Sequence, residues 1–334
     1  MLYIRVDMNQ TIATGHIMRC ISIADALRQL GENTVFILAD EQAAELLNTH
    51  EYEYIVLHTR WDCMDDELPV LISEIERRGI SRILIDSYQV TEHYLAALQE
   101  YVETIYIDDL NAFTYPVNTI ICYANYWSKF RYEEQYDSVK FYLGTRYVPL
   151  REAFWNCEAK KIKPRVERLL ILSGGADPYD AIGKILKQID RTWYRQIDVI
   201  CGKYNGRYCE LKEIYRNEKN IHIHKTVTDI EKYMKNADIA ISAGGTTLYE
   251  LCACGTPTIS YSLADNQLDN VKQFQEAQLI DYAGDVRYED VALKVQNYLE
   301  RYHGDSIMRR EKSLKMQQTV DGKGALRLAR ELRN

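Results

Sequence analysis

Segments with the character of β-strands and of α-helices alternate along almost the whole chain, and this limits the fold more than any other feature of the sequence. Short apolar or β-branched runs are separated by amphipathic segments in which apolar residues recur every three or four positions. The clearest helical pattern covers 16–30, where Ile17, Ile21 and Leu27 fall on one face and Gly31 follows as a C-cap. Alternating βα units predict parallel sheets that are covered by helices on both faces.

The alternation is found in both halves of the chain. Strands are predicted near 2–6, 34–38, 53–57, 81–85, 103–107 and 118–122, then near 168–172, 196–200, 221–224, 238–242 and 257–261. Helices are predicted near 16–30, 41–49, 66–78 and 92–101, then near 178–189, 208–216, 228–235, 246–254 and 267–276.

The stretch 144–166 interrupts this order, because it carries two prolines and a charged run, and we predict that it links two domains. The expected divisions are an N-terminal domain at 1–150, a C-terminal domain at 165–304 and a charged C-terminal helix at 305–334. Two doubly wound α/β domains facing each other would leave a cleft at the carboxyl ends of their strands, where open α/β folds bind ligands.

Composition excludes several classes of protein. The 334 residues are 46% hydrophobic and 27% charged, which is typical of a soluble globular protein with two domains. A net charge of −8 argues against nucleic-acid binding but leaves room for a small anion in a local pocket. The first residues predict a strand rather than a signal peptide, and no apolar run has the length of a bilayer-spanning helix. We therefore expect a cytoplasmic protein without stable membrane insertion, and its oligomeric state stays open.

The eight cysteines show neither a C-x-x-C pair nor a His/Cys spacing typical of metal ligands. Reduced and mostly buried thiols are the expectation for such a chain. The sequence therefore predicts no metal site.

A glycine corner follows the predicted strand 238–242. Gly244 and Gly245 end the strand, Thr246 comes next, and Glu250 lies one turn into the following helix. Free N–H groups and the positive pole of a helix favour phosphate at such a corner, and Glu250 is then placed to hold a ribose. The alternative is an ordinary αβ turn with a surface glutamate.

A second glycine corner, Gly174-Gly175, follows the strand 168–172, with Asp177 and Pro178 predicted as the cap and first residue of the next helix. Two such corners in one domain indicate a pocket lined by backbone. The amides of Asn266 and Gln267, after the strand 257–261, are candidates for binding phosphate or sugar hydroxyls. The alternative for this pair is a polar N-cap cluster.

In the first domain the strongest candidates surround the first βα corner. Asp7 ends the first strand, Gly15 and His16 begin the first helix, and Arg19 lies one turn further on. The positive helix pole disfavours the protonated imidazole, and a neutral histidine acts as a general base. The alternative is that His16 only caps the helix.

Polar residues also follow three later strands. Asp86 and Tyr88 come at the end of one buried strand, where Tyr88 is placed to position substrate or water. Asp108 and Asp109 follow the next strand, and because neighbours on a strand point to opposite faces, a structural role is expected for one of them. Asn125 follows the strand after that and is a candidate to line the cleft.

The order and spacing of these motifs resemble a known family, the UDP-sugar hydrolases of pseudaminic acid biosynthesis, which includes relatives from spore-coat polysaccharide synthesis. The second half also resembles glycosyltransferases of the GT-B fold that use UDP-N-acetylglucosamine. The resemblance to the hydrolases covers about 1–275 and rests on Arg5-x-Asp7, Gly15-His16-x-x-Arg19, Ile85-Asp86-x-Tyr88, Asp108-Asp109, Tyr147-x-x-Leu150-Arg151-x-x-Phe154, Gly174-Gly175-x-Asp177, Ser242-Ala243-Gly244-Gly245 and Asp265-Asn266-Gln267.

This resemblance implies a GT-B-like fold of two Rossmann-like domains and the hydrolysis of UDP-2,4-diacetamido-2,4,6-trideoxy-β-L-altropyranose to UDP and the free sugar, without a metal ion or cofactor. It also implies that the helix at 305–334 packs back on the first domain. His16 would activate a water that attacks the anomeric carbon with inversion, and Asp7 and Tyr88 would complete the catalytic set. The matching substrate-binding positions are Gly15, Arg19, Asp86, Asn125, Arg151, Gly174, Gly175, Gly244, Gly245, Thr246, Glu250, Asn266 and Gln267. Ser87 stands where some members carry a histidine, which puts an auxiliary role of that histidine in doubt.

Two rival functions stay open at this point. A GT-B glycosyltransferase with a UDP-N-acetylhexosamine donor would pass the sugar to an acceptor instead of water. A nucleotide-sugar sensor would keep the glycine corners but would not need His16.

Overall fold

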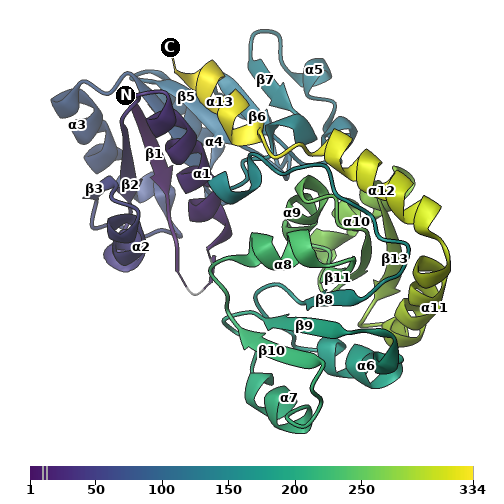
Figure 1. Cartoon of the computed structure of the whole chain (residues 1–334). Coiled ribbons are helices and arrows are strands. Elements are labelled where there is room, and N and C mark those ends of the chain that lie inside the picture. Colours follow the sequence, from purple (N-terminus) through teal and green to yellow (C-terminus); the bar gives the residue numbers. More distant parts are fainter. Residues whose placement is uncertain (10, 13, 334) are drawn as a thin grey trace. The chain divides into compact units, whose positions relative to one another are not determined.

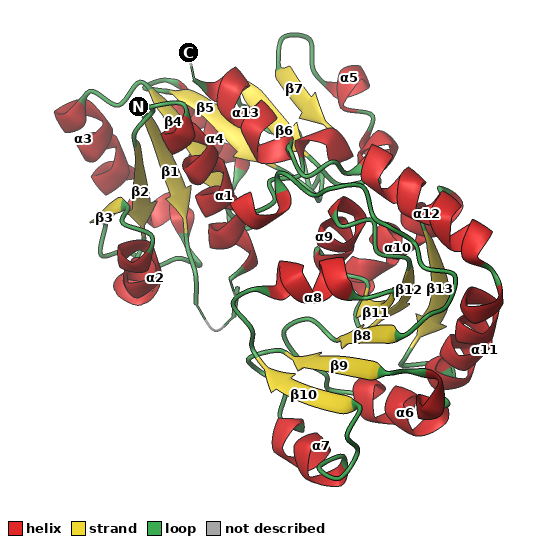
Figure 2. Cartoon of the chain, in the orientation of Figure 1, coloured by secondary structure: helices red, strands yellow, loops and turns green. Residues whose placement is uncertain are grey.

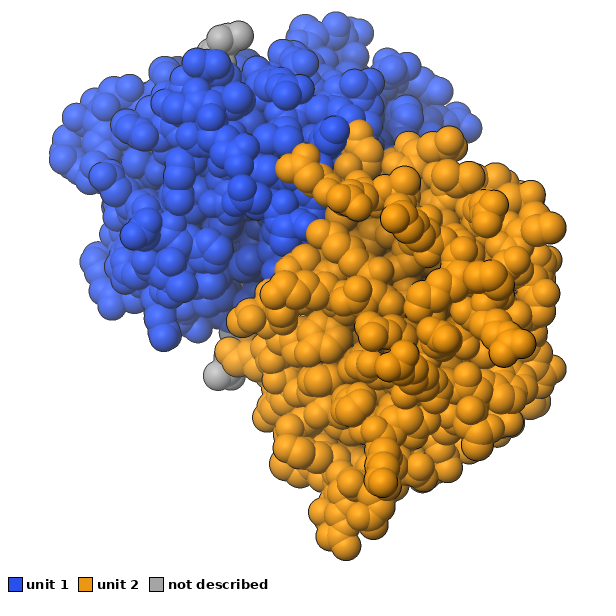
Figure 3. All heavy atoms as spheres, viewed as in Figure 1, with its two compact units in different colours: residues 1–155, 323–334 blue, residues 156–322 orange. Residues whose placement is uncertain are grey.

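The computed structural model describes residues 1–9, 11–12 and 14–333, and the chain divides into two compact units (Figure 3). Unit 1 comprises Met1–Trp155 and Lys323–Asn334, and unit 2 comprises Asn156–Gly322. Each unit contains one parallel sheet flanked by helices (Figures 1 and 2). This confirms the prediction of two doubly wound α/β domains, which rests on the alternation of strand and helix patterns.

The sheet of unit 1 has seven strands in the order β3-β2-β1-β4-β5-β6-β7, and all neighbours pair in parallel. The order reverses beside β1, so the carboxyl ends of β1 and β4 form the switch point at which such folds bind ligands. The strands are β1 (Leu2–Val6), β2 (Thr34–Leu38), β3 (Glu53–Val56), β4 (Arg82–Asp86), β5 (Glu103–Ile107), β6 (Thr119–Cys122) and β7 (Lys140–Leu143).

The described residues of unit 1 form the α-helices α1 (Gly15–Gln29), α2 (Ala44–Thr49), α3 (Leu68–Arg78), α4 (Glu92–Gln99), α5 (Tyr132–Gln135) and α13 (Gly324–Leu332). The last helix, α13, packs on α1. Gly324 lets the start of α13 lie against the backbone at Val148, since a Cβ atom at 324 would lie 2.2 Å from the carbonyl oxygen of Val148.

Unit 2 repeats this topology with six parallel strands in the order β10-β9-β8-β11-β12-β13. Its switch point lies between β8 and β11. The strands are β8 (Arg168–Leu172), β9 (Gln196–Cys201), β10 (Ile221–Lys225), β11 (Ile239–Ala243), β12 (Thr258–Ser262) and β13 (Ile280–Asp285). The helices are α6 (Ala181–Gln188), α7 (Tyr208–Ile214), α8 (Ile230–Asn236), α9 (Thr247–Ala253), α10 (Leu268–Glu276), α11 (Val291–Gly304) and α12 (Ser306–Thr319).

The structure differs from the sequence prediction in several elements. Two strands, β7 and β13, were not predicted because neither contains a continuous apolar run of ordinary strand length. α11 was not predicted either, and the segment 305–334 forms two helices because Gly322 adopts a left-handed φ of +79° between them. α6 begins at Ala181 rather than at 178, since the carboxylate of Asp177 accepts the N–H groups of Ala181 and Ile182, at 2.8 and 3.0 Å.

A buried ion cluster connects β1 to the turn before α3. The guanidinium of Arg5, which is 0% exposed, donates to both carboxylate oxygens of Glu67 at 2.7 Å and to Asp7 Oδ2 at 2.5 Å. The hydroxyl of Tyr94, on α4, donates to Glu67 Oε1 at 2.7 Å. Burial alone would lower the pKa of Arg5, but the two carboxylates raise it, so the cation stays charged in the core.

We predict that Glu67→Gln lowers the free energy of unfolding of unit 1 by about 3 kcal/mol, because it removes one partner of a buried ion pair. The matched control is Glu74→Gln on the surface of α3, where the partners Arg77 and Arg78 are solvated and the expected change is about 0.5 kcal/mol or less. Urea denaturation followed by circular dichroism measures both. Equal, small losses in the two variants would contradict a stabilising role of the cluster.

Candidate functional site

The switch point of unit 1 gathers charged side chains from a strand and a helix that lie far apart in the sequence. Val6 of β1 pairs in register with Asp86 of β4, so the two strands end side by side. α1 begins after the loop that follows β1, and its first turn carries His16 and Arg19. The parallel arrangement therefore brings both side chains to the carboxylate of Asp86.

Asp86 is 1% exposed and accepts from three nitrogen atoms. His16 Nδ1 lies 2.6 Å from Asp86 Oδ1. Arg19 binds the same carboxylate in a bidentate manner, with Nε 2.6 Å from Oδ2 and Nη2 2.5 Å from Oδ1. Burial alone would raise the pKa of Asp86, but the charge of Arg19 and the contact with His16 hold this pKa well below its ordinary value.

In the neutral imidazole of His16, the charge on Asp86 decides which ring nitrogen carries the proton. An ionised carboxylate at 2.6 Å repels a lone pair, so Nδ1 carries the proton and donates it to Asp86. The guanidinium nitrogen Nη2 of Arg19, 3.1 Å from Nδ1, is engaged with the same carboxylate. In the neutral imidazole, Nε2 therefore has the free lone pair, and an aspartate-held histidine in this tautomer accepts a proton from a hydroxyl or a water.

A second layer of polar groups surrounds Arg19. Its Nη1 donates to the hydroxyl of Tyr123 at 2.6 Å and to Asp109 Oδ2 at 3.2 Å. Tyr88, which is 44% exposed, donates its hydroxyl to the same Asp109 oxygen at 3.0 Å and sets its ring edge-on to His16, with centroids 4.6 Å apart. The other oxygen, Asp109 Oδ1, is buried without a hydrogen-bond partner in the described parts of the chain. Burial, and then the charge of Asp109, raise the pKa of Tyr88, so its hydroxyl stays protonated.

Asp7 lies in the ion cluster of β1, apart from this group. Its Oδ2 accepts from Arg5 and its Oδ1 accepts the backbone N–H of Ala39 at 2.8 Å. Both oxygens thus have structural partners, which favours a supporting role over the catalytic role expected from the sequence. Asp108 is likewise structural, since it accepts from the hydroxyls of Tyr115 and Tyr132, whereas its neighbour Asp109 faces Arg19.

The remaining predicted residues of unit 1 lie at several places. Gly15 is the exposed first residue of α1, with open space where a side chain would project. Asn125 is half-buried in the turn after β6. Arg151 lies near the end of the first chain segment of unit 1, which runs to Trp155. Its guanidinium carbon is 5.4 Å from the ring centroid of Phe154.

In unit 2 both glycine corners lie at the switch point. β8 and β11 are paired neighbours, and Gly174-Gly175 follows the first strand while Gly244-Gly245 follows the second. Gly174 has a left-handed φ of +73°, and neither Gly174 nor Gly175 has an atom within 4 Å of the place where a Cβ would lie. The backbone of this turn is therefore open to an approaching ligand.

Gly244 has a packing role that the sequence analysis did not foresee. A Cβ there would lie 2.2 Å from Val271 Cγ1 of α10, so glycine allows α10 to pack against the turn. Asn270, the preceding residue, is 6% exposed and donates its amide to the carbonyls of Gly244 and Gly245, at 2.9 and 3.3 Å. Tyr249 of α9 in turn donates its hydroxyl to Asn270 Oδ1 at 2.9 Å. The sequence did contain a signal for the role of Asn270, because this polar residue falls on the apolar face of the predicted helix 267–276.

The other predicted residues of unit 2 flank this turn. Thr246 is exposed just before α9, and Glu250 is half-buried in the first turn of that helix. Gln267 directs Oε1 to the backbone N–H of Leu263 at 2.9 Å, which leaves its amide nitrogen for other contacts, and Asn266 is exposed.

Gly202, after β9, is a further residue that the sequence analysis missed. A Cβ at this position would lie 2.0 Å from the carbonyl oxygen of Gly174 and 2.5 Å from that of Gly175. The backbone N–H of Tyr204 donates to the Gly175 carbonyl at 3.0 Å. The turns that follow β8 and β9 thus pack against each other at the carboxyl ends of these strands. The need for glycine at 202 follows from this contact, which the sequence alone does not show.

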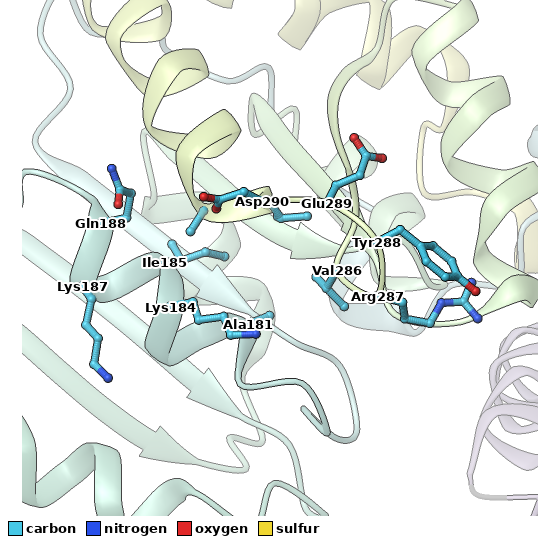
Figure 4. A pocket seen from close by; sticks show the side chains of 12 residues that line it. Ala181, Lys184, Ile185, Lys187, Gln188, Val286, Arg287, Tyr288, Glu289 and Asp290 are labelled. Atoms are coloured by element: carbon cyan, nitrogen blue, oxygen red, sulfur yellow. The ribbon is translucent and has the colours of Figure 1, made fainter.

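A cavity of about 590 Å³ opens elsewhere in unit 2, between α6 and the loop that leads from β13 into α11 (Figure 4). It is lined by side chains of both charges, such as Lys184, Arg287 and Asp290, and by Tyr288 at its rim. None of the predicted site residues lines it. We take the switch point of each unit as a candidate site by itself, because titratable side chains gather at the one in unit 1 and open backbone turns at the one in unit 2.

Within residues 1–9, 11–12 and 14–333, no cluster of three or more His, Cys, Asp or Glu side chains is arranged to hold a metal ion. No helix in the same part of the chain is long and apolar enough to cross a membrane.

Comparison with known proteins gives the class of fold. The family model described as glycosyl transferases group 1 matches residues 157–310, which lie in unit 2. MurG of Acinetobacter baumannii superposes with a TM-score of 0.70 at 12% identity, over 99% of this chain and 98% of that one. The glycotransferase of kitacinnamycin gives a TM-score of 0.71 at 13% identity, over the same shares. The chain therefore has the GT-B fold.

Three curated relatives align with a larger part of this chain than the family model does. An uncharacterized protein of Methanocaldococcus jannaschii is 22% identical over 76% of this chain and 54% of its own length. The spore coat polysaccharide biosynthesis protein SpsG of Bacillus subtilis is 21% identical over 78% of this chain and 77% of its own. A third relative, from Helicobacter pylori, is named pseudaminic acid cytidylyltransferase and UDP-2,4-diacetamido-2,4,6-trideoxy-β-L-altropyranose hydrolase. It is 26% identical over 59% of this chain and 37% of its own length. The chain thus spans about half of the first relative and little more than a third of the last.

We predict that Gly202→Ala lowers the free energy of unfolding of unit 2 by about 2–3 kcal/mol, because the added methyl group forces two turns apart. Gly206→Ala is the matched control, since a Cβ there meets no atom within 4 Å. Differential scanning calorimetry compares the two variants. A shift in melting temperature that is as large for Gly206→Ala as for Gly202→Ala would contradict the close packing of the turns.

We also predict a pH-dependent effect of Asp86→Asn. The folded-state pKa of Asp86 lies well below the unfolded value of about 3.9, so its ionic stabilisation is complete above that value and is lost as the pH falls toward the folded-state pKa. The free energy of unfolding of the wild type should exceed that of Asp86→Asn by about 3 kcal/mol at pH 7. This difference should shrink below about pH 4. Urea denaturation between pH 7 and 3 measures it, and a difference independent of pH would assign the effect to packing instead of charge.

Proposed function

We propose that the protein hydrolyses a UDP-linked amino-deoxy sugar, UDP-2,4-diacetamido-2,4,6-trideoxy-β-L-altropyranose or a close analogue, to UDP and the free sugar. The observation that carries this proposal is the His16–Asp86 pair, with its 2.6 Å contact at the switch point of unit 1. The name of the Helicobacter pylori relative includes this hydrolase activity, and its alignment of 204 residues is longer than unit 2 and so extends into unit 1. The relative SpsG supports a place in the synthesis of a surface polysaccharide.

The proposed step is an attack by water on the anomeric carbon. His16 Nε2 removes one proton of the water while the oxygen forms a bond to that carbon. The bond between the anomeric carbon and the diphosphate oxygen breaks, so that UDP leaves as an anion and the free sugar has inverted configuration. Asp86 holds the Nδ1 proton and stabilises the imidazolium that forms, which makes it a positioning residue for the base.

Arg19, Tyr88 and Asp109 are proposed to orient the sugar. Arg19 fixes Asp109 by a contact of 3.2 Å, and Tyr88 donates to the same oxygen at 3.0 Å. Asp109 Oδ1 is then available to accept from an amide N–H or a hydroxyl of the substrate. In unit 1, Gly15, Asn125 and Arg151 keep in this proposal the substrate-binding role that the family resemblance implies.

UDP is proposed to bind unit 2. The diphosphate would lie at Gly244, Gly245 and Thr246, where N–H groups stabilise the charge that develops on the leaving group, and Glu250 would hold the ribose. The open turn Gly174-Gly175 and the amides of Asn266 and Gln267 complete the set. In this arrangement a metal ion is not required for the departure of UDP.

Glycosyl transfer is the second candidate, and the match of residues 157–310 to the glycosyl transferases group 1 model favours it. The same base would then remove the proton of an acceptor hydroxyl instead of water. Transfer needs an acceptor, whereas hydrolysis proceeds without one, so the two functions give different products from a single donor.

We predict that purified protein with this UDP-sugar, EDTA and no acceptor releases UDP and a free sugar of inverted configuration, measured by proton NMR. UDP-N-acetylglucosamine serves as the parallel donor. If UDP binds but neither donor is hydrolysed, transfer becomes the better proposal and acceptors are screened next. Turnover that stops in EDTA and returns with a divalent cation would contradict the metal-independent step.

We further predict that His16→Ala lowers kcat by about 10²–10⁴ while the Kd for UDP stays unchanged, because the base acts only in the chemical step. His93→Ala is the matched control, since this histidine is exposed on α4 of the same unit. Isothermal titration calorimetry gives the Kd and the NMR assay gives kcat. Full activity of His16→Ala would refute the assignment of the base.

A further inference from the structure

The cavity between α6 and the loop from β13 into α11 is separate from the residues of the proposed reaction, none of which belongs to its described lining (Figure 4). This lining lies entirely in unit 2, so its walls belong to one compact body. The volume of about 590 Å³ is typical of pockets that hold small organic molecules, and half of the lining residues are apolar or aromatic. Ile185 comes from α6, and Val286 and Val291 come from the other wall. The space therefore suits a ligand with an apolar ring system.

An exposed aromatic ring stands at the rim of this cavity. Tyr288 is 79% exposed, and the guanidinium carbon of Arg287 lies 5.2 Å from the centroid of its ring. Arg287 is itself held by two carboxylates, since its Nη2 donates to Asp285 Oδ2 at 2.7 Å and to Asp265 Oδ1 at 2.6 Å. The positive charge of Arg287 is thus already neutralised, and the ring of Tyr288 offers apolar surface to a ligand.

The acidic residues of the lining also have partners within unit 2. The carboxylate of Glu289 is paired with the ammonium of Lys294. Asp290 is the N-cap residue of α11 and accepts the backbone N–H of Leu293 at 3.1 Å. Both carboxylates therefore have a role in holding this wall of the cavity.

Hydrogen-bond donors, in contrast, remain available at the cavity. Lys184 and Lys187 lie on α6, and neither side chain has a partner among the residues that the structure describes. In the same part of the chain, the backbone N–H of Ala292 donates to no acceptor, although this residue in the first turn of α11 is only 8% exposed. The positive pole of the 14-residue helix α11 adds to these donors. Together they favour an anionic group on the ligand.

From these observations we propose that the cavity is a second ligand site of unit 2, for a small molecule that combines an apolar ring system with an anionic group. The ring system packs on Ile185 and Val286 and reaches Tyr288 at the rim. The anionic group binds the ammonium of Lys184 and the N–H of Ala292. Since the site uses none of the residues proposed to bind UDP, it stands or falls independently of the proposed function.

Fluorescence titration with 8-anilinonaphthalene-1-sulfonate, an anionic aromatic probe, tests the proposal. N-phenyl-1-naphthylamine has the same ring system without the sulfonate group and serves as the neutral probe. We expect one sulfonate probe per chain and about tenfold weaker binding of the neutral probe, because the contact between the sulfonate and Lys184 is then absent. Saturating UDP should leave the Kd of the sulfonate probe unchanged. Displacement of this probe by UDP, or equal affinity for the two probes, would overturn the proposal.

A charge reversal locates the bound probe. Lys184→Glu should raise the Kd of the sulfonate probe at least about tenfold and leave the Kd of the neutral probe nearly unchanged. Lys219→Glu is the matched control, since it makes the same change at an exposed lysine of unit 2 outside the cavity. Tyr288→Ala should weaken the binding of both probes about threefold, because both share the ring system. An equal effect of Lys184→Glu and Lys219→Glu on the sulfonate probe would show that the anionic group does not bind in this cavity, and the proposal would be wrong.

Discussion

The negative charge of Asp86 is the interaction on which the arrangement of unit 1 depends. A carboxylate that is 1% exposed would be costly alone, but here it neutralises a buried guanidinium and anchors an imidazole. Because the carboxylate is ionised, the proton of His16 is on Nδ1 and the lone pair is on Nε2. Because Arg19 is fixed by the same group, its other nitrogen holds Asp109, and Asp109 holds the hydroxyl of Tyr88. The orientation of each of these polar side chains therefore depends on Asp86, the last residue of β4.

The two units use the same sheet topology for different chemistry. In unit 1 the switch point collects titratable side chains, whereas in unit 2 it collects backbone turns that side chains support from behind. Asn270 satisfies the carbonyls of Gly244 and Gly245, and Gly202 allows the turn after β9 to press against Gly174. These contacts occupy backbone carbonyls of the two turns. The open space beside Gly174 and Gly175 is then the part of the turns that a ligand could approach closely. Such a division suits the proposed reaction, in which unit 1 supplies titratable side chains and unit 2 binds the diphosphate leaving group.

Much of the fold was predictable because buried parallel strands and amphipathic helices leave strong periodic patterns. The corner positions of His16, Arg19, Asp86 and the glycines were predictable for a related reason, since parallel sheets place ligands where strands end. What the sequence does not contain is the pairing of distant groups. Nothing in the pattern shows that Asp7 serves Arg5 while Asp86 serves His16, because both aspartates follow strands in the same way. Gly202 and Asn270 also escaped prediction, as their roles depend on contacts with loops remote in sequence.

The chemistry of unit 1 explains why the fold alone does not separate hydrolysis from transfer. A neutral imidazole held by a carboxylate removes a proton from any hydroxyl of suitable position, and water and a sugar alcohol differ little in this respect. The choice between them depends on which oxygen reaches the anomeric carbon, and hence on groups that admit or exclude an acceptor. Tyr88 is such a group, because it lies edge-on to the imidazole, is 44% exposed and is held by Asp109. We propose that this aromatic ring beside the base limits the space for a bulky alcohol more than the space for water, and that it thereby selects water as the attacking group.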